Sequence, residues 1–350
     1  MKKHAIIPIF IPHEGCPNDC VFCNQKKITA RQKPVHPEDV KNIIEQYLTT
    51  LTGRGLETIE VAFFGGSFTG IPLLEQSAYL AVAKQFKDNG FIDKIHLSTR
   101  PDYINEEILD NLKYYDTDII ELGVQSFDDS VLKASNRGHN SEIVYSSCEL
   151  IKSYGFQLGI QLMIGLPGDT HEKSLYSARE TVKIGPSIAR LYPTIIIDDT
   201  ELLAMYRQGA YQPLSQQEAV FTTKEMYKIL NTAGINIIRV GLKSTDIISE
   251  NGAITGDTYH PAFRQLVEAE IAKEVLEDKL VKLLSSSEQY CSKSTMEKQH
   301  FTFESNSRCF SNMIGNKRSN KEYFSRKYPN LRIRFAENTL LADNHYNVLK

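Results

Sequence analysis

The feature that most constrains the fold is a regular alternation of apolar, β-branched runs with amphipathic helical patterns between residues 4 and 240. Repeated strand–helix units build a parallel sheet, and its functional side chains lie on loops at the carboxyl ends of the strands. The predicted strands are 4–11, 58–64, 94–98, 118–124, 157–164, 188–197 and 236–240, and the predicted helices are 39–51, 73–89, 105–114, 142–154, 171–184 and 216–233.

The number of these units predicts the fold class. About six strand–helix units fit before residue 197, which indicates an α/β fold with a partial (β/α)6 TIM-like barrel. After Gly241 the alternation stops, and a long helical pattern at 263–284 precedes a segment that mixes helix and strand patterns. We therefore expect a barrel domain at residues 1–245 and a small α+β C-terminal domain at residues 246–350.

Three of the six cysteines lie close together, as Cys16, Cys20 and Cys23, directly after the first predicted strand. Six cysteines in 350 residues are too few for a disulfide scaffold, so the C-x3-C-x2-C spacing indicates metal ligation. Thiolates suit iron–sulfur clusters and zinc, and three ligands on a cubane leave one iron open for chemistry. Structural zinc would need a fourth ligand, for which His13 and His36 are candidates, so zinc stays an alternative.

Charge and hydropathy exclude some classes of protein. The formal net charge is −3, which does not by itself demand a nucleic-acid partner. The segment 293–350 nevertheless carries 11 Lys and Arg against 5 Asp and Glu, which suits either an anionic partner or a solvated basic face. No run approaches the ~18 apolar residues of a membrane span, and the N-terminus lacks a signal-peptide pattern. We expect a cytoplasmic protein without membrane contact.

The cysteine motif resembles the signature of the radical S-adenosylmethionine (SAM) superfamily, C-x3-C-x-aromatic-C, with Phe22 at the aromatic position. The resemblance implies a [4Fe–4S] cluster on Cys16, Cys20 and Cys23, with SAM bound to the open iron. It further implies an electron donor such as a flavodoxin or ferredoxin, reductive cleavage of SAM and a 5′-deoxyadenosyl radical that abstracts hydrogen from the substrate.

The same resemblance implies which residues bind SAM. Gly65 and Gly66 match the Gly-Gly motif for the SAM amino group, although Ser67 stands where an acid is common and an ordinary strand–helix turn is the alternative. The glycines let the backbone approach a ligand closely. The full set of expected SAM-contacting residues is Gly65, Gly66, Ser67, Thr99, Gln125, Ser126, Arg137 and Gly165, with Gln125, Ser126 and Arg137 assigned to the ribose and carboxylate and Gly165 near the adenine.

The sequence allows more than one role for several charged residues near the predicted strand ends. Arg137 is either a SAM ligand or part of a surface ion pair. Glu121 is expected to be an acid at the rim of the barrel that Arg100 neutralises. Arg239 and Lys243 are either ligands for an anionic substrate group or solvated cations.

Longer motifs narrow the resemblance to one branch of the superfamily. FFGGSFTG, STRPDYI, ELGVQSFDDSVL and GLPGDT resemble the branch that holds the Elongator catalytic subunit and oxygen-independent coproporphyrinogen oxidase. The segment 256–267 and the sequence 315–318 resemble a radical SAM C-terminal domain. Because the chain ends at Lys350, we expect no acetyltransferase domain after the barrel.

Three functions follow from these motifs. The first is a radical SAM enzyme for tRNA or another RNA, in which basic residues contact phosphates and Tyr323, Phe324 and Tyr328 either stack on bases or form a core. The second is a radical SAM enzyme for a small molecule of the porphyrin type. The third is a non-catalytic zinc or iron–sulfur binding protein.

Overall fold

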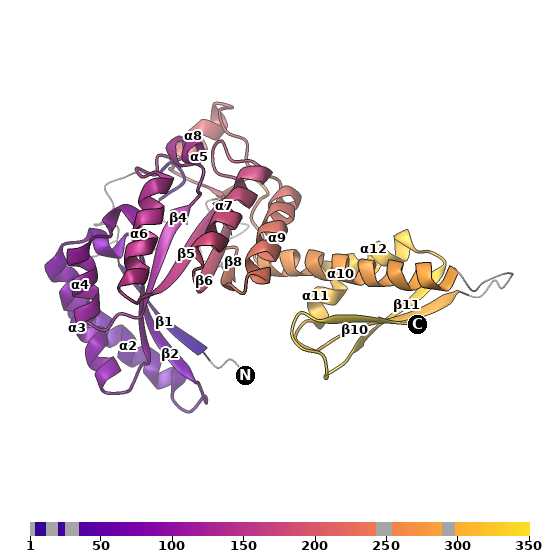
Figure 1. Cartoon of the computed structure of the whole chain (residues 1–350), viewed down its shortest axis with the longest axis horizontal. Coiled ribbons are helices and arrows are strands. Elements are labelled where there is room, and N and C mark those ends of the chain that lie inside the picture. The colour runs from indigo at the N-terminus through magenta and orange to yellow at the C-terminus, as the bar shows by residue number, and fades with distance from the viewer. Residues whose placement is uncertain (1–3, 12–19, 25–34, 243–253, 289–297) are drawn as a thin grey trace. The chain divides into compact units, whose positions relative to one another are not determined.

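The computed structural model describes residues 4–11, 20–24, 35–242, 254–288 and 298–350 (Figure 1). The chain divides into two compact units, Met1–Pro261 and Ala262–Lys350. The predicted boundary between residues 245 and 246 lies outside the described residues, so the division 1–245 and 246–350 stays a prediction. Within the described residues, no helix is both long and apolar enough to cross a membrane.

Unit 1 is built around a curled sheet of seven parallel strands, which confirms the expected partial TIM-like barrel. The strand order is β1-β2-β3-β4-β5-β6-β8, so β1 and β8 form the two edges of the sheet. The strands are β1 (His4–Ile11), β2 (Thr58–Gly65), β3 (Lys94–Thr99), β4 (Ile119–Gln125), β5 (Gln157–Ile164), β6 (Ile188–Pro193) and β8 (Asn236–Val240).

Helices cover one face of this sheet (Figure 1). Alternate strand residues such as Val61, Leu97, Leu122 and Leu162 are fully buried on the helix-covered face. The main helices of unit 1 are α2 (Pro37–Leu51), α3 (Leu73–Asp88), α4 (Glu106–Tyr114), α6 (Ser141–Ser153), α7 (His171–Ile184) and α9 (Gln216–Thr232), with short α5 (Asp129–Ala134), η2 (Phe68–Gly70) and η3 (Pro101–Tyr103).

Local sequence explains where these helices begin and end. The side chains of Asn105 and Thr170 cap α4 and α7 by accepting a hydrogen bond from the backbone N–H three residues on. α7 ends at Gly185, whose φ of 69° is the left-handed conformation that glycine adopts readily. These signals, together with the apolar periodicity, are why the six helices predicted for unit 1 agree with the observed ones to within two residues at each end.

The predicted strand 188–197 is wrong at its carboxyl end. β6 stops at Pro193, and a separate two-residue strand β7 (Ile196–Ile197) pairs antiparallel with β9 (Ile254–Thr255). Proline lacks the N–H that would continue a ladder, so the chain leaves the sheet there. The short helix α8 (Glu201–Arg207), which the sequence analysis did not predict, follows this break.

Unit 2 has the expected α+β composition. A three-stranded sheet in the order β11-β10-β12 packs against helices, and the elements are α10 (Phe263–Glu288), β10 (Gln299–Ser305), α11 (Phe310–Ile314), η4 (Asn316–Arg318), α12 (Ser319–Lys327), β11 (Leu331–Glu337) and β12 (Tyr346–Leu349). Phe301, Phe303 and Phe324 are at most 2% exposed in its core.

The core position of Phe324 contradicts its suggested role as a base-stacking residue. Its ring packs edge-on against Phe303 with centroids 4.9 Å apart. Tyr323 and Tyr328 pack beside it and donate hydrogen bonds from their hydroxyl groups to Glu277 at 2.8 and 2.7 Å. Phe324 is therefore a core residue of the small domain, and the partly exposed Tyr323 and Tyr328 pack against that core.

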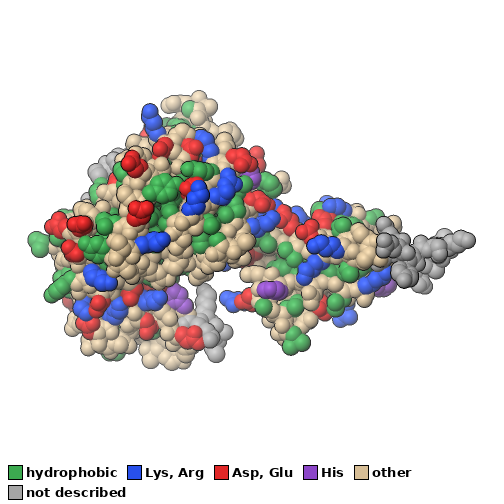
Figure 2. Space-filling model, viewed as in Figure 1, with side chains coloured by type: hydrophobic (Ala, Val, Ile, Leu, Met, Phe, Trp, Pro, Cys, Tyr) green, Lys and Arg blue, Asp and Glu red, His purple; other side chains and the backbone are tan. Residues whose placement is uncertain are grey.

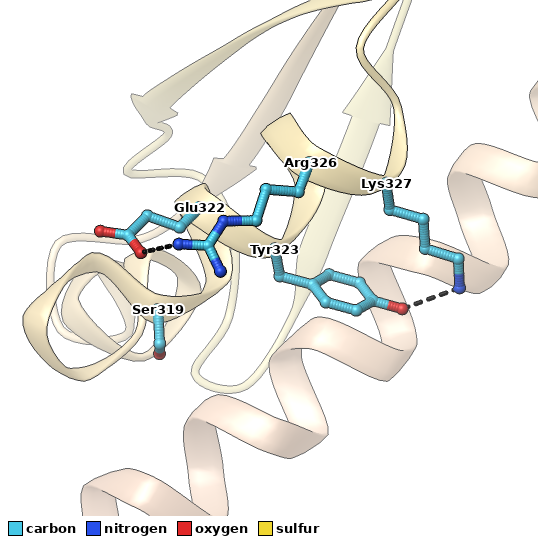
Figure 3. A pocket seen from close by; sticks show the side chains of 5 residues that line it. All are labelled: Ser319, Glu322, Tyr323, Arg326 and Lys327. Atoms are coloured by element: carbon cyan, nitrogen blue, oxygen red, sulfur yellow. Dashed lines mark hydrogen bonds and ion pairs between the residues drawn. The ribbon is translucent and has the colours of Figure 1, made fainter.

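The exposed side of α12 carries a shallow pocket whose cations are already paired (Figure 3). Arg326 bonds to Glu322 at 3.2 Å, and Lys327 lies 2.7 Å from Glu277 and donates to the Tyr323 hydroxyl. On the face shown in Figure 2, acidic and basic side chains are interspersed over both units. These pairs reduce the charge that α12 offers to an anionic partner.

Candidate functional site

The cysteine segment is held by backbone contacts at the carboxyl end of the sheet. The N–H of Val21 donates to the carbonyl of Ser135, and the carbonyl of Val21 accepts from the N–H of Leu202. Cys23 closes a tight turn by donating to the carbonyl of Cys20 at 2.9 Å. Cys20 is buried and Cys23 is partly exposed, whereas Cys16 lies outside the described residues.

Two buried arginines face the sulfur of Cys20. Arg137 Nη1 donates to Cys20 Sγ at 3.1 Å, and Arg100 Nη1 lies 3.8 Å from the same sulfur. Both side chains are at most 5% exposed, and Arg100 also donates to the carbonyl of Arg137. The structure therefore brings together two predicted residues, Cys20 and Arg137, that are 117 positions apart.

The two guanidinium groups differ in how their charges are balanced. Arg100 forms a forked ion pair with Asp102, with N···O distances of 2.9 and 2.7 Å. Arg137 has no carboxylate partner among the described residues, and its buried Nε has no hydrogen-bond partner there. A buried cation without a counterion is costly, so Arg137 favours an anionic ligand at this place, such as a thiolate-bound cluster or a carboxylate.

The buried side chain of His139 stays neutral beside Arg137 near pH 7. Burial, and then the charge of Arg137, lower the pKa of His139 to about 4. A neutral histidine does not compete with Arg137 for an anion.

The low pKa of His139 predicts how the free energy of unfolding depends on pH. The unfolded chain gains a proton on His139 below its ordinary pKa of 6.5, whereas the folded chain does not until about pH 4. The neutral ring of His139 therefore makes its full contribution to the free energy of unfolding above pH 6.5. This contribution is lost as the pH falls toward 4, and it amounts to about 3 kcal/mol. We expect His139→Asn to lose less stability than the parent chain between pH 7 and pH 4.5 in urea unfolding. Equal losses would contradict this assignment, and His345→Asn, at an exposed position, is the control.

The predicted Gly65, Gly66 and Ser67 lie where β2 meets the end of β1. Gly66 donates from its N–H to the carbonyl of Ile11 at 3.1 Å. Gly65 has a φ of 110°, and a Cβ there would lie 2.3 Å from the carbonyl oxygen of Ile11. The glycine is therefore required by the close approach of two strand ends.

Ser67 and Thr99 also lie together, as neighbours at the ends of β2 and β3. Their hydroxyl oxygens are 2.8 Å apart, and the N–H of Arg100 donates to Ser67 Oγ at 3.1 Å. Thr69 Oγ1 lies 2.6 Å from Thr99 Oγ1 and donates to the carbonyl of Tyr103. This hydroxyl network fixes the backbone that carries Arg100.

Gln125 and Ser126 are neighbours at the end of β4, but their side chains bond to different elements. Gln125 ends β4 at a bulge with a φ of 71°, and its Oε1 accepts from Gln161 Nε2 at 3.1 Å. Ser126 Oγ accepts from the N–H of Asp128 and lies 3.3 Å from Ser177 Oγ on α7. The hydroxyl of Ser126 is thus already used by the fold, and both residues stay predicted SAM ligands.

Gly165 follows β5 in a turn that a buried acid holds. Its N–H donates to Asp169 Oδ2 at 2.8 Å, and its carbonyl accepts from the hydroxyl of Tyr211 at 2.6 Å. Burial raises the pKa of Asp169 despite its hydrogen bonds. A Cβ on Gly165 would lie 2.9 Å from Leu214, so this turn is also closely packed.

The expected pair between Arg100 and Glu121 is wrong. Arg190 on β6, not Arg100, neutralises Glu121, with Nε donating to Oε2 at 2.6 Å. Arg100 instead pairs with Asp102. The positions of strand ends along the chain did not reveal which charged residues face each other across the sheet.

The sequence analysis also missed a row of charged side chains on the sheet face opposite the helices. Glu60, His96, Glu121 and Arg190 form this row, which we call the charged belt. His96 Nδ1 lies 2.6 Å from Glu60 Oε1, and its Nε2 lies 3.7 Å from Glu121. Burial raises the pKa of Glu60, but the hydrogen bonds and charges of His96 and His4 together outweigh it and hold that pKa below its ordinary value. A detectable signal was the recurrence of a polar residue at the third position of β2, β3, β4 and β6.

The residues of the zinc alternative are not gathered within the described part of the chain. There, no group of three or more His, Cys, Asp or Glu side chains is arranged to hold a metal ion. His36 is the N-cap residue before α2 and its N–H donates to Asp39, while His13 and Cys16 fall outside the described residues.

Two family models match the chain. The Radical SAM superfamily model matches residues 10–177, and the Radical_SAM C-terminal domain model matches residues 186–273. Residues 274–350 lie beyond both matches.

Individual relatives agree with these models. A tRNA uridine(34) acetyltransferase of Methanocaldococcus infernus is 32% identical over 255 residues, covering 62% of this chain and 48% of that protein. The heme chaperone HemW of Bacillus subtilis is 26% identical over 220 residues, covering 61% and 56%. The chain spans about half the length of the first curated relatives that it matches.

A solved structure has the same fold. The archaeal Methanocaldococcus infernus Elp3 with an N-terminal deletion superposes with a TM-score of 0.63 at 21% identity. The match covers 79% of this chain and 64% of that chain.

Proposed function

The chain belongs to the radical SAM superfamily of enzymes, and we propose that it binds one [4Fe–4S] cluster through Cys16, Cys20 and Cys23 and uses it to cleave SAM. The observation that carries this proposal is the buried guanidinium of Arg137 at 3.1 Å from Cys20 Sγ, without a carboxylate partner among the described residues. A cationic pocket around a cysteine suits a thiolate ligand. When bound, the cluster supplies the electron that cleaves the sulfonium bond of SAM into methionine and a 5′-deoxyadenosyl radical.

The residues of the chain would position SAM rather than react with it. Arg137 has one nitrogen on Cys20 and one buried nitrogen, Nε, without a partner in the described residues, so it can bind the SAM carboxylate. The backbone of Gly65 and Gly66 would bind the amino group, and Gly165 would lie near the adenine. Ser67, Thr99, Gln125 and Ser126 complete the proposed set at the ends of β2, β3 and β4.

We propose RNA, and tRNA in particular, as the substrate. The support is similarity to proteins that are named tRNA uridine(34) acetyltransferase. The basic segment 293–350 supports it less than its composition suggested, because Arg326, Lys327 and Arg308 are paired with acids. A reducing cytoplasm and a flavodoxin- or ferredoxin-like electron donor are parts of the same proposal, since the cluster must receive an electron.

A small-molecule substrate is the second candidate. The similarity to a heme chaperone and the shared branch with porphyrin enzymes favour it. The two candidates differ in one property, because only RNA binding falls steeply with rising salt.

The experiment is anaerobic reconstitution with iron and sulfide, followed by dithionite, SAM and quantification of 5′-deoxyadenosine. We expect 5′-deoxyadenosine formation that increases on addition of tRNA and loses that increase at high salt. A colourless protein that holds zinc and forms no 5′-deoxyadenosine would contradict the proposed function. Stimulation by coproporphyrinogen and not by tRNA would favour the small-molecule reading.

A further inference from the structure

A fixed arginine lies on the sheet face opposite the helices. Arg190 on β6 donates to Glu121 at 2.6 Å, and its Nη1 lies 3.3 Å from the hydroxyl of Tyr192. The guanidinium also lies over the ring of Phe64, 4.9 Å from its centroid. Three contacts and one full counter-charge therefore hold Arg190 in place.

The neighbour of Arg190 on the next strand is Arg239 of β8. The register of the sheet sets Arg239 opposite Arg190, and the side chain is partly exposed. Among the residues that the structure describes, Arg239 forms no hydrogen bond or ion pair. Like charges opposite each other on neighbouring strands repel. The counter-charge of Glu121 is bonded to Arg190 rather than to Arg239, so an anion beside Arg239 would balance the second cation.

Tyr192 links Arg190 and Arg239 electrostatically. The charge of Arg239 acts on the phenol of Tyr192, and the phenol contacts Arg190. Glu121 is bonded to Arg190 at 2.6 Å, and His96 Nε2 lies 3.7 Å from the same oxygen. Within the described part of the sheet, Arg239 is therefore a cation without a bonded acid, beside a fixed guanidinium and a hydroxyl.

Arg239 lies on β8, the edge strand opposite to β1, which precedes the cysteines in the chain. β8 and β1 are the two edge strands, and Arg239 is the fourth of five residues of β8, near its carboxyl end. Loops at the carboxyl ends of parallel strands share one side of the sheet. A substrate that reaches from the cysteine loop toward β8 would meet Arg239.

We propose that Arg239, assisted by Tyr192 and Arg190, binds a phosphate group of the ribonucleotide substrate. A guanidinium and a hydroxyl match phosphate oxygens, and Arg binds them in a forked geometry. The choice of phosphate rather than another anion rests on the proposed RNA substrate, whereas the anion site itself rests on the geometry.

The test is binding of uridine 5′-monophosphate and of uridine to the full chain, followed by NMR. We expect the monophosphate to bind more tightly than uridine, and Arg239→Met to weaken only the monophosphate, by about tenfold. Arg239→Lys should retain part of the affinity, because it keeps the charge and loses the fork. The matched control is Arg179→Met, an exposed arginine on α7.

Several outcomes would overturn the inference. One is equal affinity of the parent chain and Arg239→Met for the monophosphate. Another is an equal loss for uridine and the monophosphate, which would mean a structural effect. Binding of coproporphyrin III that depends on Arg239 and displaces the monophosphate would assign the site to carboxylates and overturn the phosphate assignment.

Failure of the inference and failure of the proposed function give different results. If dithionite and SAM yield 5′-deoxyadenosine but Arg239→Met binds the monophosphate normally, the phosphate site alone is wrong. If no 5′-deoxyadenosine forms but monophosphate binding depends on Arg239, the phosphate site stands and the radical SAM activity is wrong.

Discussion

Cys20→Ala is expected to reduce 5′-deoxyadenosine formation by more than about 100-fold, the upper range for losing a group that merely supports a metal ligand. Cys20 is 4% exposed and its sulfur faces two guanidinium groups, so no solvent thiol can take its place. Removing one of three proposed thiolates should also lower iron and sulfide content after reconstitution. The measurement is iron content together with 5′-deoxyadenosine from the same preparation.

The matched control is Cys148→Ala. Cys148 is 1% exposed on α6, and burial raises the pKa of its thiol to about 12, so it is neutral near pH 7 and unsuited to ligate iron. This variant should keep its cluster and its 5′-deoxyadenosine formation. Equal effects of the two substitutions would mean that Cys20 acts through folding and not through the cluster.

Gly65→Ala is expected to lower the free energy of unfolding by about 3 kcal/mol or more. A φ of 110° is strained for any residue with a side chain, and the new Cβ would lie 2.3 Å from the carbonyl oxygen of Ile11. Because the Cβ meets a backbone oxygen, which cannot rotate away as a side chain can, β1 and β2 must separate. Cys16 and Cys20 follow Ile11 closely in the sequence, so SAM cleavage should fall as well. Chemical denaturation and 5′-deoxyadenosine assays measure the two effects.

Gly90→Ala separates strain from collision. Gly90 has a φ of 72°, and a Cβ there would have no heavy atom within 4 Å. It should cost only about 1 to 2 kcal/mol, the cost of a left-handed backbone, and leave SAM cleavage intact. If Gly65→Ala cost no more than Gly90→Ala, the close approach of the two strand ends would not be essential.

The sequence predicted most elements because local signals and periodicity agreed. Gln157–Ile164 and His171–Ile184 were predicted with the observed bounds, since a continuous apolar run and a capped amphipathic pattern each leave little choice. The end of β6 was missed because the apolar run continues past Pro193, although proline ends the ladder there.

Contacts across the sheet were harder to predict than positions along the chain. Cys20 was expected as a cluster ligand and Arg137 as a SAM ligand, yet only the fold shows that they touch. The pairing of Glu121 with Arg190 depends on register between β4, β5 and β6, which one sequence does not reveal. The aromatic residues around Phe324 were ambiguous because an apolar ring suits a core and a base equally well.

The most direct test of the central claim is electron–nuclear double resonance of the reduced, reconstituted protein with SAM labelled by ¹⁷O in the carboxylate and ¹⁵N in the amino group. The account predicts hyperfine coupling of both labels to the cluster, because three cysteines leave one iron open to SAM. It also predicts that the coupling disappears in Cys20→Ala and persists in Cys148→Ala. An intact [4Fe–4S] cluster whose spectrum is unchanged by SAM and shows no coupling to either label would contradict it.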